Sequence, residues 1–247
     1  MLQPAIAEPT SPPSLGPAEA RVRRLNATWR DAPPREVLRA MVEEEFPGRT
    51  ALLSSFGAEA GVALHILSEV APDTPVLFLD TGMHFGQTLP HRDLLAARLG
   101  LTDVRTVRAL DTADHDPRGD LWKRDADACC DLRKVRPLAA ALPGFDCVVG
   151  GRKRFHGEGR ARLPRFELID GQVRLNLLAD WDAERLESYR VAHALPQHPL
   201  VQAGYRSIGC WPCSRPTHDA DAGVRSGRWE GQTKTECGIH LPRRTAA

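Results

Sequence analysis

The chain has 247 residues and a formal net charge of +1, with 26% charged and 42% hydrophobic residues. These proportions are those of a globular protein that buries a core, and they exclude a disordered chain. The near-neutral charge disfavours a nucleic-acid binder, and no apolar run approaches the length of a membrane span.

Residues 1–18 are rich in Pro, Ala and Ser, which predicts a disordered segment. The first basic residue is Arg21, and no early positive region precedes an apolar one, so the segment does not read as a secretory signal. We therefore expect a cytoplasmic protein without a membrane or nucleic-acid partner. Six cysteines are too few for a disulfide scaffold, and clustered thiols in a reduced compartment indicate metal binding or catalysis.

Apolar spacing predicts alternating helices and strands. Helical spacing begins near Ala18 and resumes after Pro34. Further on, the predicted strands are 51–53, 75–80, 104–107 and 147–150, and the predicted helices between them are 62–70, 89–99 and 131–142. Alternation of this kind predicts an α/β fold with an open, mostly parallel twisted sheet and helices on both faces.

The character of the chain changes after residue 151. Residues 152–165 carry six Lys or Arg and one acid, which predicts a mobile basic loop. Asp170-Gly171 between two apolar segments predicts a hairpin, and residues 180–195 read as a helix with Asp182 as N-cap. We expect a nucleotide-binding α/β domain at 19–203 and a Cys-rich tail at 204–247 that packs on it and is organised by a ligand.

Two turns follow predicted strands at the edge where open α/β sheets bind ligands. In the first, Ser54-Ser55-Phe56-Gly57-Ala58-Glu59, the glycine permits close backbone approach and the next helix offers free N–H groups to an anion. In the second, Leu79-Asp80-Thr81-Gly82, the carboxylate and hydroxyl could bind a nucleoside. Taken alone, each pattern is also typical of an ordinary turn that binds no ligand.

Four cysteines have the spacing of a metal site. Cys129-Cys130 and Cys210-x-x-Cys213 supply four thiolates. Zinc would need all four sulfurs around one atom, which adjacent residues make awkward, whereas each thiolate of a [4Fe–4S] cluster bonds a different iron. The pattern favours the cluster and leaves zinc open. Cys147 lies in an apolar strand without a spacing partner and is expected in the core.

Cations surround a further cysteine near the C-terminus. Cys237 follows Arg225, Arg228 and Lys234 and precedes His240. Positive charge favours the nucleophilic thiolate, whereas Glu236 opposes it, so a nucleophile and an inert thiol both remain open. Lys134 and the run Gly151-Arg152-Lys153-Arg154 suit a small anion such as phosphate or sulfate.

Taken together, these motifs resemble the assimilatory adenylyl-sulfate (APS) reductases of the APS/PAPS reductase family. The matching segments are SSFGAE at 54–59, LDTG at 79–82, CCDLRK at 129–134, GRKR at 151–154, GYRSIGCWPC at 204–213, RSGRW at 225–229 and ECGIH at 236–240. They span nearly the whole chain after residue 50. Departures from many relatives occur at Ala60, at Gln87 and at Arg154-Phe155-His156.

The resemblance implies a fold like that of the adenine-nucleotide α-hydrolases and the reduction of adenosine 5′-phosphosulfate (APS) to sulfite and AMP, with thioredoxin as reductant, in sulfate assimilation and cysteine biosynthesis. It implies Cys237 as nucleophile and Cys129, Cys130, Cys210 and Cys213 as ligands of a [4Fe–4S] cluster. The implied substrate-binding residues are Ser55, Gly57, Ala58, Glu59, Leu79, Asp80, Thr81, Gly82, Lys134, Arg152, Arg225, Arg228 and His240. Lys134 would bridge cluster and substrate.

Three alternatives remain beside this interpretation. The substrate could be the 3′-phosphorylated form, PAPS, or both nucleotides. An adenylating enzyme of the ATP-pyrophosphatase type would carry an SGGxDS-like loop, which Phe56 and Ala60 do not fit. A zinc-stabilised binding module would not need Cys237. The sequence leaves the oligomeric state open, a homo-oligomer included.

Overall fold

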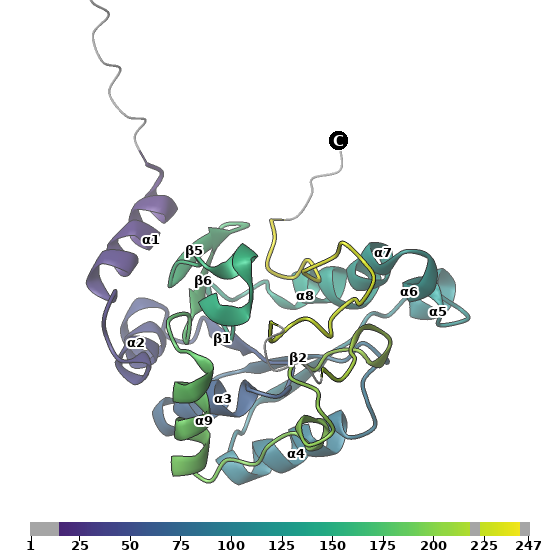
Figure 1. The fold of residues 1–247 in the computed structure, drawn as a ribbon. Helices are drawn as coiled ribbons and strands as arrows, with labels where there is room; N and C mark the ends of the chain where they lie inside the picture. The colour runs from purple at the N-terminus through teal and green to yellow at the C-terminus, as the bar shows by residue number, and fades with distance from the viewer. Residues whose placement is uncertain (1–14, 218–222, 243–247) are drawn as a thin grey trace, which may run out of the picture.

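The computed structural model describes residues 15–217 and 223–242, and a single sheet of six strands organises them (Figure 1). The strands are β1 (Thr50–Leu53), β2 (Val76–Leu79), β3 (Val104–Val107), β4 (Cys147–Gly150), β5 (Phe166–Ile169) and β6 (Gln172–Asn176). Their order is β3-β2-β1-β4-β6-β5, and all neighbours are parallel except the antiparallel β5–β6 pair. The predicted α/β class and mostly parallel sheet are confirmed.

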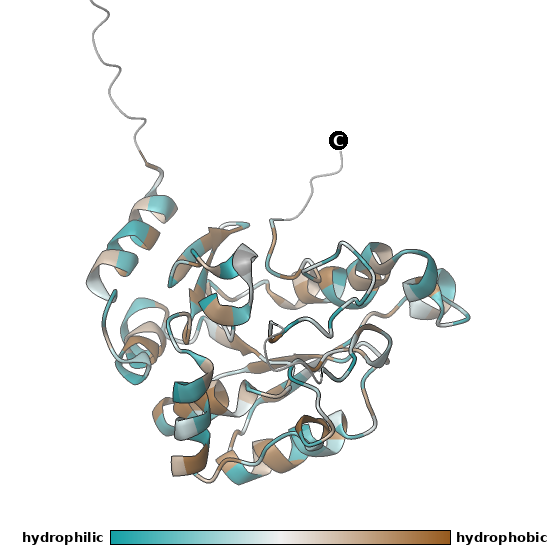
Figure 2. Ribbon diagram, viewed as in Figure 1, coloured by the Kyte–Doolittle hydropathy of each residue, from teal (hydrophilic) through white to brown (hydrophobic). Residues whose placement is uncertain are grey.

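The helices cover both faces of this sheet. They are α1 (Pro17–Thr28), α2 (Pro34–Ala40), α3 (Ala60–Val70), α4 (Thr88–Leu99), α5 (Thr112–His115), α6 (Leu121–Arg124), α7 (Ala126–Cys130), α8 (Arg136–Ala141) and α9 (Ala183–Ala192). Strand residues alternate between two apolar clusters. Leu52 and Phe78 pack with α2, α3 and α4, whereas Ala51 and Leu77 pack with α8. Both faces of the central strands β2 and β4 are buried, and these strands are continuously apolar. The edge strand β3 is partly exposed and contains Arg and Thr, and brown predominates in the middle of the sheet in Figure 2.

The helix predicted at 131–142 begins earlier and changes character within its length. The Asp125 side chain caps α7 by accepting hydrogen bonds from the N–H groups of Asp127 and Ala128. A π-helical turn, Asp131–Val135, then joins α7 to α8. Pro137 lacks an N–H and cannot continue regular α-helical bonding, and the wider turn lies directly before it.

The segment 152–165 is packed, which corrects the expectation of a mobile basic loop. It contains two short 3₁₀ turns, Arg154–His156 and Glu158–Arg160. The side chains of Arg152, Lys153, Arg160 and Arg165 are buried. Each of them finds an oxygen partner within the fold. Composition shows the charges of such a segment but not the distant groups that pair with them.

Local turn and capping predictions are confirmed. Asp170 and Gly171 have φ angles of 50° and 78°, as a tight hairpin turn between β5 and β6 requires. Asp182 caps α9 by accepting a hydrogen bond from the N–H of Arg185, so the helix begins at Ala183 rather than at residue 180. Of the segment expected to be disordered, residues 1–14 lie outside the described residues, and α1 already begins at Pro17.

The described residues of the tail, 204–217 and 223–242, fold back onto the sheet (yellow-green to yellow in Figure 1). The N–H of Trp211 bonds to the carbonyl of Met83, just after β2. Gly238 packs against Val135 in the π-helical turn. Within the described ranges, no helix combines the length and the apolar character needed to cross a membrane.

Candidate active site

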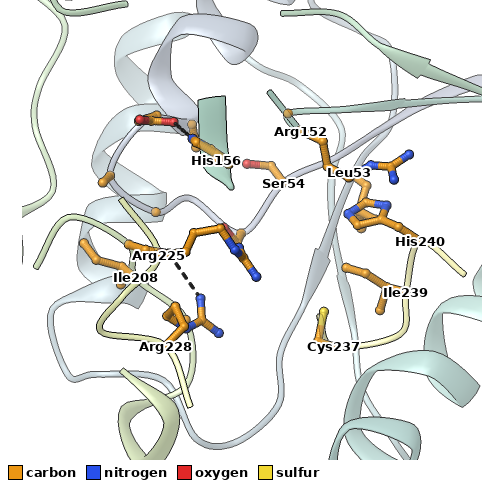
Figure 3. Close-up of a pocket in the computed structure, with 18 of the residues that line it drawn as sticks. Leu53, Ser54, Arg152, His156, Ile208, Arg225, Arg228, Cys237, Ile239 and His240 are labelled. Atoms are coloured by element: carbon orange, nitrogen blue, oxygen red, sulfur yellow. Dashed lines mark hydrogen bonds and ion pairs between the residues drawn. The ribbon is translucent and has the colours of Figure 1, made fainter. Parts of the chain in front are cut away.

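A pocket of about 230 Å³ lies where the tail crosses the carboxyl ends of β1, β2 and β4 (Figure 3). It brings together most of the side chains that the sequence pointed to. The predicted residues that line it are Ser55, Gly57, Ala58, Glu59, Leu79, Thr81, Lys134, Arg152, Cys210, Arg225, Arg228, Cys237 and His240. They come from five separate stretches of the chain: the loops after β1, β2 and β4, the π-helical turn and the tail. The three loops meet because parallel strands end at one edge of the sheet.

The β1–α3 loop, residues 54–59, is held in a strained shape. Phe56 is fully buried with a φ of 49°, and its N–H bonds to the Ser54 hydroxyl at 3.1 Å. A left-handed non-glycine residue costs about 1–3 kcal/mol and persists only where its surroundings impose it. At Gly57 a Cβ would stand 3.1 Å from the carbonyl oxygen of Ile208. The glycine therefore lets the tail approach the loop closely.

The loop ends at the N-terminus of α3. Glu59 is the N-cap residue, but its side chain makes no capping bond, so the first N–H groups of the helix have no side-chain partner there. Its carboxylate instead accepts hydrogen bonds from Lys153 at 2.7 Å and His156 at 2.8 Å. Burial alone would raise the pKa of Glu59, but these two partners outweigh it and lower the pKa to about 2. Glu59 is thus an anion engaged within the protein.

The residues of the second turn, 79–82, have two roles: some line the pocket and others hold the turn in shape. Leu79 and Thr81 line the pocket, and the Thr81 hydroxyl lies 3.3 Å from the Cys210 sulfur. Asp80 and Gly82 do not line it. The Asp80 carboxylate accepts from the Gly82 N–H at 3.0 Å and from Arg108 Nε at 2.8 Å. In this structure Asp80 fixes the turn.

The four paired cysteines gather beside the pocket. Cys129 and Cys130 end α7, and Cys210 and Cys213 flank the 3₁₀ turn Trp211–Cys213. The charge of Cys129 couples to those of Cys210 and Cys213, and the charge of Cys130 couples to that of Cys210. All four are free thiols.

The spread of these thiols bears on the kind of metal group they could hold. Within residues 15–217 and 223–242, no three Cys, His, Asp or Glu side chains converge on a point that would hold one metal ion. Burial raises the pKa of the Cys130 thiol to about 12, although the positive charge of Lys134 acts in the opposite direction. Four neighbouring thiols are a donor set that both zinc sites and iron–sulfur clusters use.

Lys134 lies between the cysteine group and the pocket. Burial would lower the pKa of its ammonium, but the charges of Cys210, Cys237 and Cys130 outweigh burial and raise it. Lys134 is therefore a cation that interacts with two of the paired cysteines and with Cys237. The bridging role of Lys134 between a cluster and the substrate stays a prediction.

Arg225 and Arg228 face Cys237 and His240 across the pocket (Figure 3). The Arg228 Nε donates to the carbonyl of Cys213 at 3.0 Å. A Cβ at Gly209 would stand 2.4 Å from the guanidinium of Arg228, so glycine makes room for this side chain. Burial lowers the pKa of Arg225 to about 10, which still leaves it charged at neutral pH.

Arg152 and His240 form the opposite wall. Arg152 donates to Asn176 Oδ1 at 3.1 Å and pairs with Glu167. Burial, followed by the neighbouring charges of Arg152 and Arg160, lowers the pKa of His240 well below its usual range. At neutral pH the ring is therefore an uncharged hydrogen-bonding group, which corrects its inclusion among the cations near Cys237.

Sequence reasoning assigned Lys153 to an anion site only as part of a basic run, and it did not single out His156 or Arg160 as site residues. Lys153, His156 and Arg160 line the pocket, and Glu236 joins them from the tail. The Arg160 guanidinium binds both oxygens of Glu236, at 2.6 and 2.7 Å. Glu236 was expected to oppose a thiolate at Cys237, but two arginines pair with it. The basic segment was the only sequence signal, because these partners stand 76 to 97 residues apart.

Comparison with known proteins assigns the family. The phosphoadenosine phosphosulfate reductase domain matches residues 49–216. An adenosine 5′-phosphosulfate reductase of Mesorhizobium japonicum is 43% identical over 96% of this chain and 95% of its own. One from a Chelativorans species is 46% identical over 79% of this chain and 80% of its own. A phosphoadenosine 5′-phosphosulfate reductase of Gloeobacter violaceus is 35% identical over 92% of this chain and 97% of its own.

Solved structures agree on the fold. The phosphoadenylyl-sulfate reductase of Candida auris, in a phosphate complex, has a TM-score of 0.69 and 28% identity over 82% of this chain and 98% of its own. An FMN adenylyltransferase of Candida glabrata has a TM-score of 0.56 at 16% identity over 96% of this chain and 83% of its own, a likeness of fold alone. The matched domain and the identity to curated relatives over most of their length show that this chain belongs to the APS/PAPS reductase family.

Proposed function

We propose that the protein reduces APS to sulfite and AMP, with thioredoxin as electron donor, as a cytoplasmic step of sulfate assimilation and cysteine biosynthesis. One observation carries the proposal. A single pocket presents Cys237 together with cations from the π-helical turn, the segment after β4 and the tail, beside a loop that opens a helix. That arrangement suits a thiol that attacks an anionic sulfur. The printed names of the curated relatives agree with APS as substrate.

The substrate's two ends find different partners in the pocket. The phosphate of the nucleotide suits the N-terminus of α3 and the exposed Ser55, because N–H groups without a side-chain cap and the helix dipole favour an anion there. The sulfate end suits Arg225, Arg228 and Lys134, which line the same pocket as Cys237. Arginine binds such oxygens in a bidentate manner, and neutral His240 can donate one hydrogen bond.

The sulfur transfer is a displacement. The Cys237 thiolate attacks the sulfur of APS, the bond from sulfur to the bridging phosphate oxygen breaks, and AMP leaves with that electron pair. The product on the protein is S-sulfocysteine. Thiolate and sulfate repel each other, so the cations lower the barrier by neutralising both where charge accumulates.

Release of sulfite is a thiol exchange. A thioredoxin thiolate attacks the Cys237 sulfur, and sulfite leaves with the electrons of the broken S–S bond. The second thioredoxin thiol then resolves the mixed disulfide. One dithiol becomes a disulfide, which supplies the two electrons that take sulfate sulfur to the oxidation state of sulfite. The tail must therefore open to a protein partner after it has closed over substrate.

Cys129, Cys130, Cys210 and Cys213 would hold a [4Fe–4S] cluster, to which their spacing and burial are suited. When bound, such a cluster supplies a local charge beside the anion site and joins the tail to α7. Lys134 keeps its own charge between these cysteines and Cys237.

A second candidate is PAPS as substrate, alone or together with APS. The Gloeobacter relative carries the PAPS reductase name at 35% identity, so sequence similarity does not separate the two nucleotides. The 3′-phosphate of PAPS would need a further cation near the ribose. Lys153 lines the pocket but is already paired with Glu59, which favours APS.

Intact-protein mass tests the proposal directly. Anaerobically purified protein is mixed with APS, and separately with PAPS, without reductant. We expect a sulfo-group gain with APS that is absent in Cys237→Ser, whereas AMP binding to that variant is retained. A gain with both nucleotides would show dual specificity. No gain with either, on protein shown to contain its cluster, would refute the covalent mechanism.

A further inference from the structure

A line of polar contacts connects the β1–α3 loop to the tail. Lys153 donates to Glu59 at 2.7 Å, and Glu59 also contacts His156 Nε2 at 2.8 Å. His156 Nδ1 lies 3.4 Å from Arg160, whose guanidinium binds both oxygens of Glu236. Five side chains from three distant segments thus form one connected network, here called the loop–tail network.

The protonation states along this network are mutually consistent. Burial lowers the pKa of His156, so the ring is neutral and has one donor and one acceptor nitrogen. Nε2 donates to the Glu59 carboxylate, and Nδ1 then accepts from Arg160, which can only donate. Every contact therefore pairs a donor with an acceptor.

Burial makes the network costly to break. The side chains of Lys153 and Arg160 are only 4% and 10% exposed. A buried cation that loses its carboxylate is left uncompensated in a medium of low dielectric, which disfavours that state. Opening the tail would withdraw Glu236 from Arg160, whereas Arg225, which lies 3.6 Å from Glu236, belongs to the tail itself. The closed tail is thus favoured while Glu59 and His156 keep Arg160 in place.

The two ends of the network lie at the two reacting parts of the site. Glu59 ends the loop that leads into α3, and Glu236 directly precedes Cys237. We infer that Arg160 and Glu236 are positioning residues, which couple occupation of the β1–α3 loop by a nucleotide to the placement of Cys237 over it. This inference rests on the proposed function only for the reaction that Cys237 performs. Coupling of this kind is reciprocal, so a closed tail also strengthens nucleotide binding.

The first test follows the tail without any turnover. Cluster-loaded protein is alkylated with iodoacetamide, with and without saturating AMP, and modification of Cys237 is followed by peptide mass. We expect AMP to slow alkylation of Cys237 by about tenfold, a typical coupling, in the unmodified protein but not in Glu236→Gln or Arg160→Met. Equal protection by AMP in all three proteins would overturn the inference.

The second test is a double-mutant cycle on residues that do not touch. His156 and Glu236 contact each other only through Arg160. We expect His156→Ala and Glu236→Gln each to slow sulfo-group transfer to Cys237 in a single turnover. Because both break one network, the double variant should be little slower than the slower single one. Rates that multiply would mean two independent sites and would overturn the inference.

A matched control removes a carboxylate from another buried arginine. Asp180 pairs with Arg165 at 3.1 Å outside the pocket. Asp180→Asn should keep the protection by AMP, and its effect should combine with that of His156→Ala independently. If the unmodified protein gives no sulfo adduct with APS, the proposed reaction fails, while the alkylation experiment still decides whether the loop–tail network couples the two segments.

Discussion

Replacing Glu59 by glutamine tests the electrostatics that shape the β1–α3 loop. The folded protein lowers the pKa of this carboxyl from 4.5 to about 2, because Lys153 and His156 outweigh burial. That difference is about 2.5 pKa units, and each unit corresponds to about 1.4 kcal/mol. Ionised Glu59 therefore stabilises the fold by about 3 kcal/mol at neutral pH. The side chain is 24% exposed, so screening by solvent is limited.

The sign of the pH dependence follows from the direction of the shift. A carboxyl whose pKa is lower in the folded state contributes fully above its unfolded pKa and loses the contribution as pH falls towards the folded pKa. The stabilisation by Glu59 should thus be complete at pH 7 and decline as pH falls below 4.5 towards about 2.

Calorimetry of Glu59→Gln can measure this effect. For a chain of this size 1 kcal/mol shifts the unfolding midpoint by about 2–4 °C, so we expect a midpoint about 6–12 °C lower at pH 7. The gap should narrow at about pH 3.5. Glu187→Gln is a matched control, because Glu187 forms an exposed ion pair with Arg190, and such pairs contribute about 0–1 kcal/mol. Equal midpoints for Glu59→Gln and the control, or a gap that does not change with pH, would refute the reasoning.

Three further changes probe the pocket. Gly209→Ala places a methyl group 2.4 Å from the Arg228 guanidinium and should slow sulfur transfer about tenfold or more with AMP affinity nearly unchanged, by single-turnover mass and calorimetry. Cys210→Ser should lose bound iron and activity together; an iron assay that finds a full complement would remove Cys210 from the ligand set. Lys134→Ala should slow sulfur transfer about a hundredfold while weakening AMP binding much less, and an unchanged rate would contradict its bridging role.

Much of the fold could be predicted from the amino-acid sequence alone. Apolar runs of strand length between helical patterns predicted four strands of the sheet, and each lies within a residue or two of its predicted place. Asp170-Gly171 and Asp182 predicted a turn and a cap because those geometries depend on neighbouring residues only. The turns after β1 and β2 were expected to meet, since parallel strands bring their carboxyl ends to one edge. The meeting of Lys134 and the tail with these turns was implied by the family resemblance.

The sequence by itself determined the α/β sheet, the edge that carries the pocket and the residue types gathered there, because these follow from short-range patterns. Only the tertiary structure decided how each charged side chain is used. Asp80 accepts a hydrogen bond from Arg108, and Glu59 binds Lys153 and His156. Glu236 pairs with the buried Arg160, which is 76 residues away in the chain. The charge state and partner of a buried ionisable group depend on desolvation and on groups distant in the chain, which no local pattern contains.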